Sequence, residues 1–195
     1  MQKHKSTQIV GRHSGGDNEE KRLLERVAER DRDSLAELYC NYHSRLFRFV
    51  FRLVPNFATA EELVNDTMML VWEKAASFRG ESRVSTWIFG IAYRITMRRL
   101  SRKRVMLLSS DRLDELAVDT RQPLEQADWI RRGIEALPDN QRAAVVLVFY
   151  LGLTYEEAAD VAECPVNTMK TRMFHARRKL RTLLGEHGLP LKEQS

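Results

Sequence analysis

The sequence predicts an all-α fold made of two small helical domains, and three observations support this prediction. Gly and Pro are scarce, at 9 and 5 of 195 residues, while residues with high helix propensity are abundant. Apolar residues recur at helical spacing through most of the chain, and no alternating β pattern competes with them. Residues 105–126 are acidic and weakly periodic, so we expect a flexible linker between two strongly periodic segments.

The helix boundaries are predicted from local signals. Residues 1–18 are polar and contain Gly15-Gly16, so we expect a flexible N-terminal tail with helix from Glu19 onward. Three capping boxes, each a Ser or Thr followed by Glu at the third position, mark further helix starts. They are Ser34-x-x-Glu37, Thr59-x-x-Glu62 and Thr154-x-x-Glu157.

The first domain is expected to span residues 19–104. Its helix after Ser34 should end near Pro55 and bury Leu35, Leu38, Tyr39, Tyr42, Leu46, Phe49, Val50 and Leu53. The helix after Thr59 carries on one face Ala60, Leu63, Val64, Thr67, Leu70, Val71, Lys74 and Phe78. The sequence "RGES" then breaks the pattern, and a third helix is expected from Ser85 or Thr86.

The second domain is expected to span residues 127–187, followed by a C-terminal tail at 188–195. Pro138 separates a short helix from "NQRAAVVLVFYLGL". The sequence "LTYEEAADVAECPVNTMKTRMFHARRKL" then gives a capped short helix, a tight turn at "ECP" and a longer helix from Val166. Pro165 suits the start of that helix because its missing N–H would be unpaired there. This is the layout of a helix-turn-helix.

The helix from Val166 has two distinct faces. At 100° per residue, its core face comprises Val166, Met169, Met173, Ala176, Leu180 and Leu183. The opposite face comprises Asn167, Thr168, Thr171, His175 and Arg178, flanked by Lys170, Arg172 and Phe174. Short hydrogen-bonding groups with cations at the edges suit a DNA major groove. The alternative is that the basic residues only favour the C-terminal end of a helix dipole, but the capped helix and turn before them favour the groove.

Two further surfaces are predicted in the first domain. Between Phe78 and Arg104, aromatic residues alternate with cations, and six of the eleven residues from Arg94 to Arg104 are basic with none acidic, which favours nucleic-acid contact. Trp87 and Ile91 are individually more typical of a core. The outward face of the helix after Thr59 mixes acids with large apolar groups, namely Glu61, Glu62, Asn65, Met69, Trp72 and Glu73. Such a face suggests a basic protein partner, although the residues alone slightly favour burial of Met69 and Trp72 by another helix.

Other classes of protein are disfavoured. Cys40 and Cys164 stand far apart, which argues against a disulfide framework or a zinc site and fits a reducing cytoplasm. The N-terminus lacks a signal peptide, and the longest apolar run, 143–151, is too short to cross a bilayer. No P-loop, H-E-x-x-H or G-x-S-x-G is present, so we expect no enzyme, cofactor, metal or small-molecule substrate. The net charge of +5 favours polyanions.

Four segments together resemble one known family over residues 19–184. They are "AEELVNDTMMLVWEKAASFRGES", "STWIFGIAYRI", "IEALPDNQRAAVVLVFYLGLTYEEAA" and "CPVNTMKTRMFHARRKL". In this order the chain resembles a bacterial sigma factor of the sigma-70 family, of the short extracytoplasmic-function (ECF) type. The resemblance implies binding to core RNA polymerase, through the clamp helices of its largest subunit and its β flap, and to promoter DNA. It also implies control by an anti-sigma factor.

The resemblance assigns roles to three sets of residues. The polymerase set is Glu61, Glu62, Asn65, Asp66 and Met69. The set for melting and reading the −10 element is Phe78, Arg79, Ser82, Arg83, Arg94, Arg98 and Arg99, with "SFRGESRVS" as the loop that captures a flipped base. The −35 positions that the resemblance assigns are Lys170, Thr171, Arg172, Phe174 and His175. The expected −35 set adds to them three residues of the outward face: Asn167, Thr168 and Arg178.

Two positions depart from the family pattern, which usually has Gly at Asn167 and Arg at His175. An imidazole cannot make the two-pronged guanine contact of arginine, so the −35 preference is expected to differ. Two other functions are compatible with parts of the sequence. A stand-alone helix-turn-helix regulator leaves the first domain's surfaces unexplained, and a decoy that only mimics a sigma factor would not need the intact basic segments.

Overall fold

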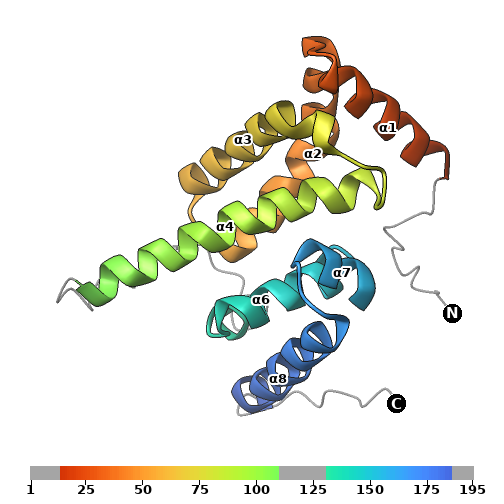
Figure 1. Ribbon diagram of the computed structural model, residues 1–195. Helices are drawn as coiled ribbons and strands as arrows, with labels where there is room; N and C mark the ends of the chain where they lie inside the picture. Colours follow the sequence, from red (N-terminus) through yellow and green to blue (C-terminus); the bar gives the residue numbers. More distant parts are fainter. Residues whose placement is uncertain (1–13, 110–130, 186–195) are drawn as a thin grey trace, which may run out of the picture.

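Helices are the regular secondary structure of the described part of the chain. The computed structural model describes residues 14–109 and 131–185, and these ranges contain no strand. The helices are α1 (Ser14–Ala28), α2 (Arg32–Leu53), α3 (Phe57–Lys74), η1 (Ala75–Ser77), α4 (Val84–Ser109), α6 (Asp139–Val145), η2 (Val146–Tyr150), α7 (Tyr155–Val161) and α8 (Val166–Gly185), with a further helical stretch at 131–135. The all-α prediction is confirmed (Figure 1).

The helices α1 to α4 form a first bundle. Most of the predicted core face of α2 is buried, with Leu38, Tyr42, Leu46 and Phe49 all fully inaccessible, but Leu35 and Tyr39 are only half-buried. The ring of Phe49 meets Phe89 of α4 edge-on, with centroids 5.6 Å apart and planes at 89°. The α3 residues that we expected inward, from Ala60 to Val71, are buried with one exception: Leu70 is half-buried and Met68 takes its place.

Two of the three predicted helix starts are wrong by one turn. The N-cap of α2 is Asp31, whose carboxylate accepts the backbone N–H of Ser34, and Ser34 is itself buried inside the helix. The N-cap of α3 is Asn56, whose side chain accepts the backbone N–H of Thr59 at 2.9 Å. Asp and Asn are at least as good N-caps as Ser and Thr, so the upstream residue takes that role. The third box, Thr154 with Glu157, is present as predicted.

Two other boundaries also differ from the prediction. Helix α1 begins at Ser14 rather than Glu19, and Asp17 in its first turn favours this earlier start. Helix α4 begins at Val84 and continues to Ser109, so residues 105–109 are helical rather than linker. Lys, Arg, Met and Leu are good helix formers, and no Gly or Pro interrupts them. Residues 1–13, 110–126 and 188–195, which we expected to be tails and linker, lie outside the described residues.

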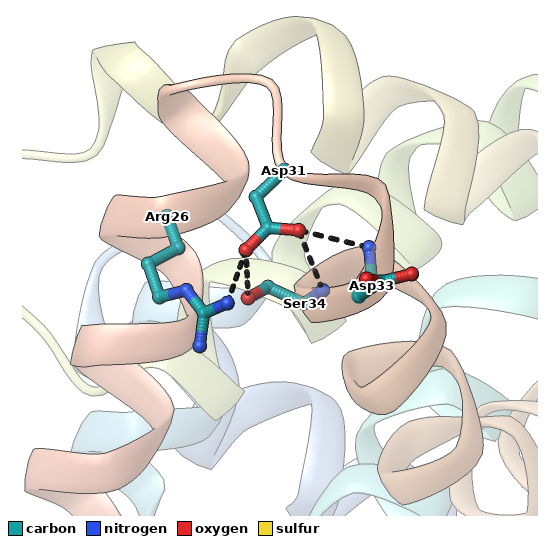
Figure 2. Close-up of polar contacts among 4 residues, drawn as sticks. All are labelled: Arg26, Asp31, Asp33 and Ser34. Atoms are coloured by element: carbon teal, nitrogen blue, oxygen red, sulfur yellow. Dashed lines mark hydrogen bonds and ion pairs between the residues drawn. The ribbon is translucent and has the colours of Figure 1, made fainter.

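The start of α2 is held by a cluster of polar contacts around one carboxylate (Figure 2). Asp31 accepts the Ser34 hydroxyl at 3.0 Å and the backbone N–H of Asp33 at 3.0 Å, and it is ion-paired with Arg26 of α1. The hydrogen bond from the Ser34 hydroxyl is the main reason that the pKa of Asp31 lies below its ordinary value of 3.8. The cluster therefore joins α1 to α2 when Asp31 is ionised.

We expect Asp31→Ala to lower the free energy of unfolding at pH 7, and the difference from wild type to shrink below about pH 4. The folded pKa is lower than the unfolded pKa, so the stabilisation is present above the unfolded value and is lost as pH falls through the folded one. Urea unfolding followed by circular dichroism at pH 7 and pH 3 measures both differences. Asp33→Ala is the matched control, since Asp33 contributes its backbone N–H to this cluster. A difference that stays constant with pH would contradict the role of the carboxylate.

The second bundle comprises residues 131–185 and contains the predicted helix-turn-helix. Its centre is formed by Leu147, Ala158, Val161, Met169 and Met173, which are all buried. The segment η2 is a turn of π-helix that closes with a hydrogen bond from the Leu151 N–H to the Val146 carbonyl at 3.0 Å. The π-turn ends the helical run that begins after Pro138.

The two bundles pack directly against each other, which the sequence did not predict. Helix α7 lies on the side of α4 (Figure 1), and η2 lies against α2. The Arg142 side chain donates to the Leu53 carbonyl at 3.1 Å, which joins α6 to the end of α2. The Arg52 guanidinium lies 3.8 Å from the ring centroid of Tyr150. The two predicted domains thus share one continuous apolar core in this arrangement.

Candidate nucleic-acid interface

The helix-turn-helix is held rigidly by local chemistry. Thr154 and Glu157 cap α7 reciprocally, with hydrogen bonds of 3.1 and 2.9 Å. The turn between α7 and α8 contains Glu163 at φ 47°, and α8 begins at Val166 as predicted. Met169, Met173 and Ala176 are fully buried behind α8. The predicted inward face of this helix is confirmed at these three residues, while the other three, Val166, Leu180 and Leu183, are half-buried.

The opposite face of α8 points away from the core. Asn167, Lys170, Thr171 and Arg178 are exposed, and Phe174 is exposed to 58%. Thr168, Arg172 and His175 are half-buried. The predicted −35 set therefore lies on one accessible surface. Within it, Arg172 also lies beside Tyr93 of α4: burial raises the pKa of Tyr93, and the Arg172 guanidinium opposes that rise.

A shallow hollow of about 440 Å³ lies along this face of α8. Its residues come from the start of α6 and from α8: Pro138, Asn140, Gln141, Asn167, Thr168, Thr171, Arg172 and His175. Sequence reasoning missed Asn140 and Gln141, because the turn after Pro138 gave no sign of which helix it would approach. Amide, hydroxyl and imidazole groups around an open hollow can all hydrogen-bond to a polar ligand.

Side chains on the outward face of α8 contact the helix backbone and one another. The Thr171 hydroxyl donates to the Asn167 carbonyl at 2.8 Å, so it offers only lone pairs and a methyl group to a ligand. The Arg178 guanidinium lies 5.9 Å from the Phe174 ring centroid. The His175 ring meets the same phenylalanine nearly edge-on, at 5.5 Å. Phe174 therefore contacts both Arg178 and His175 on this face.

The predicted −10 set lies on the loop before α4 and along α4 itself. The Phe78 ring packs on Trp87 with centroids 5.5 Å apart, so both are half-buried. Ile91 is buried, as expected for a core residue. Gly80 has φ 73°, which gives the 78–83 loop its sharp turn, and Arg79 lies 3.9 Å from Glu81 in the same loop. Ser82 is half-buried beside them.

The cations of α4 and of the loop before it differ in their environment. Arg83 is paired with Glu157 of α7 at 3.3 Å, and Arg94 is paired with Glu163 of the turn before α8. Arg99 approaches Glu62 of α3 at 3.4 Å, and Arg98 is exposed. The basic segment thus divides into a part that faces the second bundle and a part that faces solvent.

The predicted polymerase set lies on the outer side of α3. Met69 is exposed to 56%, and Glu62, Asn65 and Asp66 are exposed beside it. The Glu61 carboxylate lies 3.0 Å from the His43 Nε2 atom. The Asn65 side-chain oxygen accepts a hydrogen bond from the Tyr39 hydroxyl at 3.1 Å. The expectation that Met69 is buried, which the residues alone slightly favoured, is therefore wrong.

Trp72, the other apolar residue of that face, is covered in part. It is half-buried, and Arg30 lies over its ring at 5.3 Å while donating to the Trp72 carbonyl at 3.0 Å. A row of aromatic rings on α2, formed by Tyr39, His43, Phe47 and Phe51, continues this surface. Sequence reasoning missed the row, although its four-residue spacing is visible in the sequence.

The described residues contain no cluster of three or more His, Cys, Asp or Glu side chains that could hold a metal ion. Within those same ranges, no helix has the length and apolar character needed to cross a membrane.

Comparisons with known proteins match both bundles. Residues 38–105 match the family model described as Sigma-70 region 2, and residues 127–180 match the one described as Sigma-70, region 4. The chain is 30% identical over 174 residues to the ECF RNA polymerase sigma factor SigK of Mycobacterium sp. (strain JLS), which covers 84% of this chain and 89% of that protein. It is 30% identical over 170 residues to the ECF RNA polymerase sigma-E factor of Salmonella typhimurium (strain LT2), covering 80% and 88%.

Solved structures show a similar fold. The sigma factor RpoE of Bartonella quintana, solved in complex with the anti-sigma factor NepR, is 27% identical with a TM-score of 0.65. That match covers 77% of this chain and 96% of RpoE. CnrH, solved in complex with the cytosolic domain of CnrY, has a TM-score of 0.64 at 20% identity and covers 86% of this chain and 97% of its own.

Proposed function

Because the chain belongs to the sigma-70 family and is an ECF-type RNA polymerase sigma factor, we propose that its two bundles divide promoter recognition between them. In this proposal the outward face of α8 reads the −35 element in the major groove. The loop before α4 and the basic residues of α4 contact and help to open the −10 region. The outer face of α3 binds the clamp helices of core polymerase, and the second bundle binds the β flap.

One observation carries this assignment. The outward side of α8 presents hydrogen-bonding groups and cations, while Met169 and Met173 anchor the helix from behind with no exposure. A major groove is wide enough for one helix, and base edges are read by short polar side chains from such a face. Phosphate contacts by Lys170 and Arg178 at its margins would set the register.

The proposal extends to partners and location. An anti-sigma factor is an expected partner, since RpoE was solved with NepR bound. We propose a cytoplasmic location, where core polymerase and promoter DNA are found. The chain needs no catalytic residue of its own, because the nucleotidyl transfer belongs to the polymerase.

In vitro transcription with core polymerase on a library of randomised promoters tests the proposed function. We expect transcripts that depend on this chain and a consensus with two elements. A stand-alone regulator would bind DNA without core polymerase and would not be retained by it in a pull-down. Absence of both transcription and polymerase binding would overturn the proposal.

We expect Lys170→Ala to weaken promoter binding of the holoenzyme about equally across −35 sequences. Loss of one phosphate contact should reduce the slope of log affinity against log salt by about 0.9. Fluorescence anisotropy with the promoter at several salt concentrations measures this slope. Arg177→Ala removes the same charge from the same helix, but its guanidinium is bonded to the Tyr155 hydroxyl at 2.9 Å, so it serves as the control. An unchanged slope in Lys170→Ala would contradict the phosphate contact.

We expect Met69→Ala to lower the affinity for core polymerase about fivefold or more, because an exposed apolar side chain amid polar ones is typical of an interface anchor. Met69→Leu keeps the apolar volume and should restore most of the binding. Surface plasmon resonance with immobilised core polymerase measures both variants. Equal binding by Met69→Ala and wild type would remove Met69 from the polymerase set.

A further inference from the structure

The hollow beside α8 extends the proposed DNA-reading face onto a second helix. One side of the hollow is the outward face of α8, from Asn167 to His175, and the other side is the start of α6. The two helices pack against each other within the second bundle (Figure 1). On the α6 side, Asn140 is exposed and lines the hollow together with its neighbour Gln141. A ligand in the hollow would therefore meet side chains from both helices.

The groups that line the hollow favour an anion. Its eight residues include one cation, Arg172, and no acid. The acid next to the hollow in the sequence, Asp139, lies 3.6 Å from the Arg142 guanidinium instead. Amide and hydroxyl side chains from both helices add hydrogen-bond donors. The first turn of α8 also lines the hollow, and the positive end of a helix dipole stabilises negative charge nearby.

One polar atom of the lining has no partner within the protein. The Oε1 atom of Gln141 is inaccessible and, among the described residues, accepts no hydrogen bond. A buried acceptor without a partner is unfavourable, so the polar lining of this hollow does not serve packing alone. This oxygen cannot donate to an anion. Asn140, whose side chain is exposed, offers an amide group with two N–H donors.

The dimensions of DNA place a strand over this hollow when α8 lies in the groove. A major groove is about 12 Å wide and an α-helix with its side chains is about 10–12 Å across. A helix in the groove therefore has a sugar–phosphate strand along each flank. Thr171 and His175, the proposed base readers, line the same hollow as Asn140. The strand on the α6 side of these readers thus passes over Asn140.

We propose that Asn140 donates a hydrogen bond to a backbone phosphate of the −35 element, so that α6 and α8 hold one strand from two sides. This inference deepens the function proposed above and rests on α8 lying in the major groove. Arg172 supplies positive charge in the hollow, and Asn140 supplies a neutral contact that fixes the register of the duplex. A neutral donor releases no counterion, so this contact differs from that of Lys170 in its salt dependence.

The first test compares promoter binding by holoenzymes with three substitutions at Asn140. Asn140→Ala should bind about threefold to tenfold more weakly, equally across −35 sequences and with an unchanged salt slope. Asn140→Lys should bind about threefold more tightly at low salt and steepen the slope by about 0.9. Asn140→Asp should bind more weakly than Asn140→Ala, because it places a negative charge against the phosphate. Fluorescence anisotropy at several salt concentrations measures all three variants.

Asn18→Lys is the matched control for the added charge. Asn18 is an exposed asparagine of α1 with no proposed contact to DNA or polymerase, so the same substitution adds the same charge elsewhere. This variant should match wild type in affinity and in salt slope. Because both asparagines are exposed, thermal unfolding followed by circular dichroism should show that every variant is folded.

The second test locates the contact on the DNA. Methylphosphonate replaces one phosphate at a time in the −35 element of a promoter selected in the transcription library, which removes the charge and one acceptor oxygen. At one phosphate, or at two adjacent ones, the replacement should weaken binding by wild type but not weaken Asn140→Ala further. Lys170→Ala should remain sensitive to replacement at that position, since its proposed phosphate is a different one.

Binding by Asn140→Ala within twofold of wild type, or additive losses at every methylphosphonate position, would overturn the proposal. So would equal gains in affinity for Asn140→Lys and Asn18→Lys. A change in the −35 bases that Asn140→Ala selects would place the residue against a base edge and would also overturn the phosphate contact. These outcomes leave the proposed function intact, which fails instead if wild type supports no transcription with core polymerase.

Discussion

Phe49→Ala is expected to lower the free energy of unfolding by about 3–5 kcal/mol. Phe49 is fully buried at the centre of the first bundle, and its ring meets Phe89 edge-on at 5.6 Å. The truncation removes the transfer free energy of the ring and leaves a cavity between α2 and α4, and it also removes a favourable aromatic pair. Urea denaturation followed by far-UV circular dichroism measures the loss.

The control for this prediction is another phenylalanine of the same bundle. Phe57 begins α3 and is exposed to 66%, so Phe57→Ala should change the free energy of unfolding by no more than about 0.5 kcal/mol. If the two bundles unfold in separate steps, the loss in Phe49→Ala should fall on the step of the first bundle. A loss below about 1 kcal/mol, or an equal loss in both variants, would show that Phe49 is not a central packing residue.

Helical periodicity was enough to predict which faces are buried. The spacing of Leu38, Tyr42, Leu46 and Phe49 on α2 is set by the 3.6-residue repeat, which the sequence shows directly. The same helical repeat predicts the burial of Met169 and Met173 on α8. The turn before that helix is indicated by the sequence "ECP". These features depend on neighbours within a few residues, so a single sequence can reveal them.

Helix starts were less predictable because several residues compete for the same role. Asp31 and Asn56 each precede a Ser or Thr by three residues, and either residue of each pair could cap a helix. The choice depends on the following helix: Ser34 is buried inside the bundle, so α2 begins before it. Asp31 is also joined to α1 through Arg26, a contact that the local sequence around Ser34 does not reveal.

The contacts between the bundles could not be predicted from local pattern at all. Arg83 and Glu157 are far apart in the sequence, as are Arg52 and Tyr150. The residues around each of them give no signal that identifies the contact partner. The sequence also could not distinguish Arg94, which pairs with Glu163, from Arg98, which faces solvent, although both lie in one basic segment. A charge run predicts attraction to a polyanion, but only the tertiary structure decides which charges are available.

Substitutions on the outward face of α8 are expected to change which −35 bases the holoenzyme selects. Thr171→Ala and His175→Ala should each change the bases selected by the holoenzyme, with a loss of about 1–3 kcal/mol of discrimination at the affected position. The two side chains lie one turn apart on the outward face of α8 and both line its hollow. Transcription from a library randomised in the −35 element, with deep sequencing of the transcripts, measures the selection for each variant.

A hydrogen bond within α8 limits which bases the Thr171 side chain can contact. Its hydroxyl hydrogen is committed to the Asn167 carbonyl at 2.8 Å, so the oxygen can accept from the amino group of cytosine or adenine, and the methyl group can contact thymine. Thr171→Val keeps a methyl group and loses the oxygen, so it should retain a preference for thymine and lose one for an amino group. Thr182→Ala is the control, because Thr182 makes the same kind of bond to the Arg178 carbonyl but lies three turns further along α8. If Thr171→Ala and His175→Ala select the same bases as wild type and Thr182→Ala, the outward face of α8 does not read the promoter.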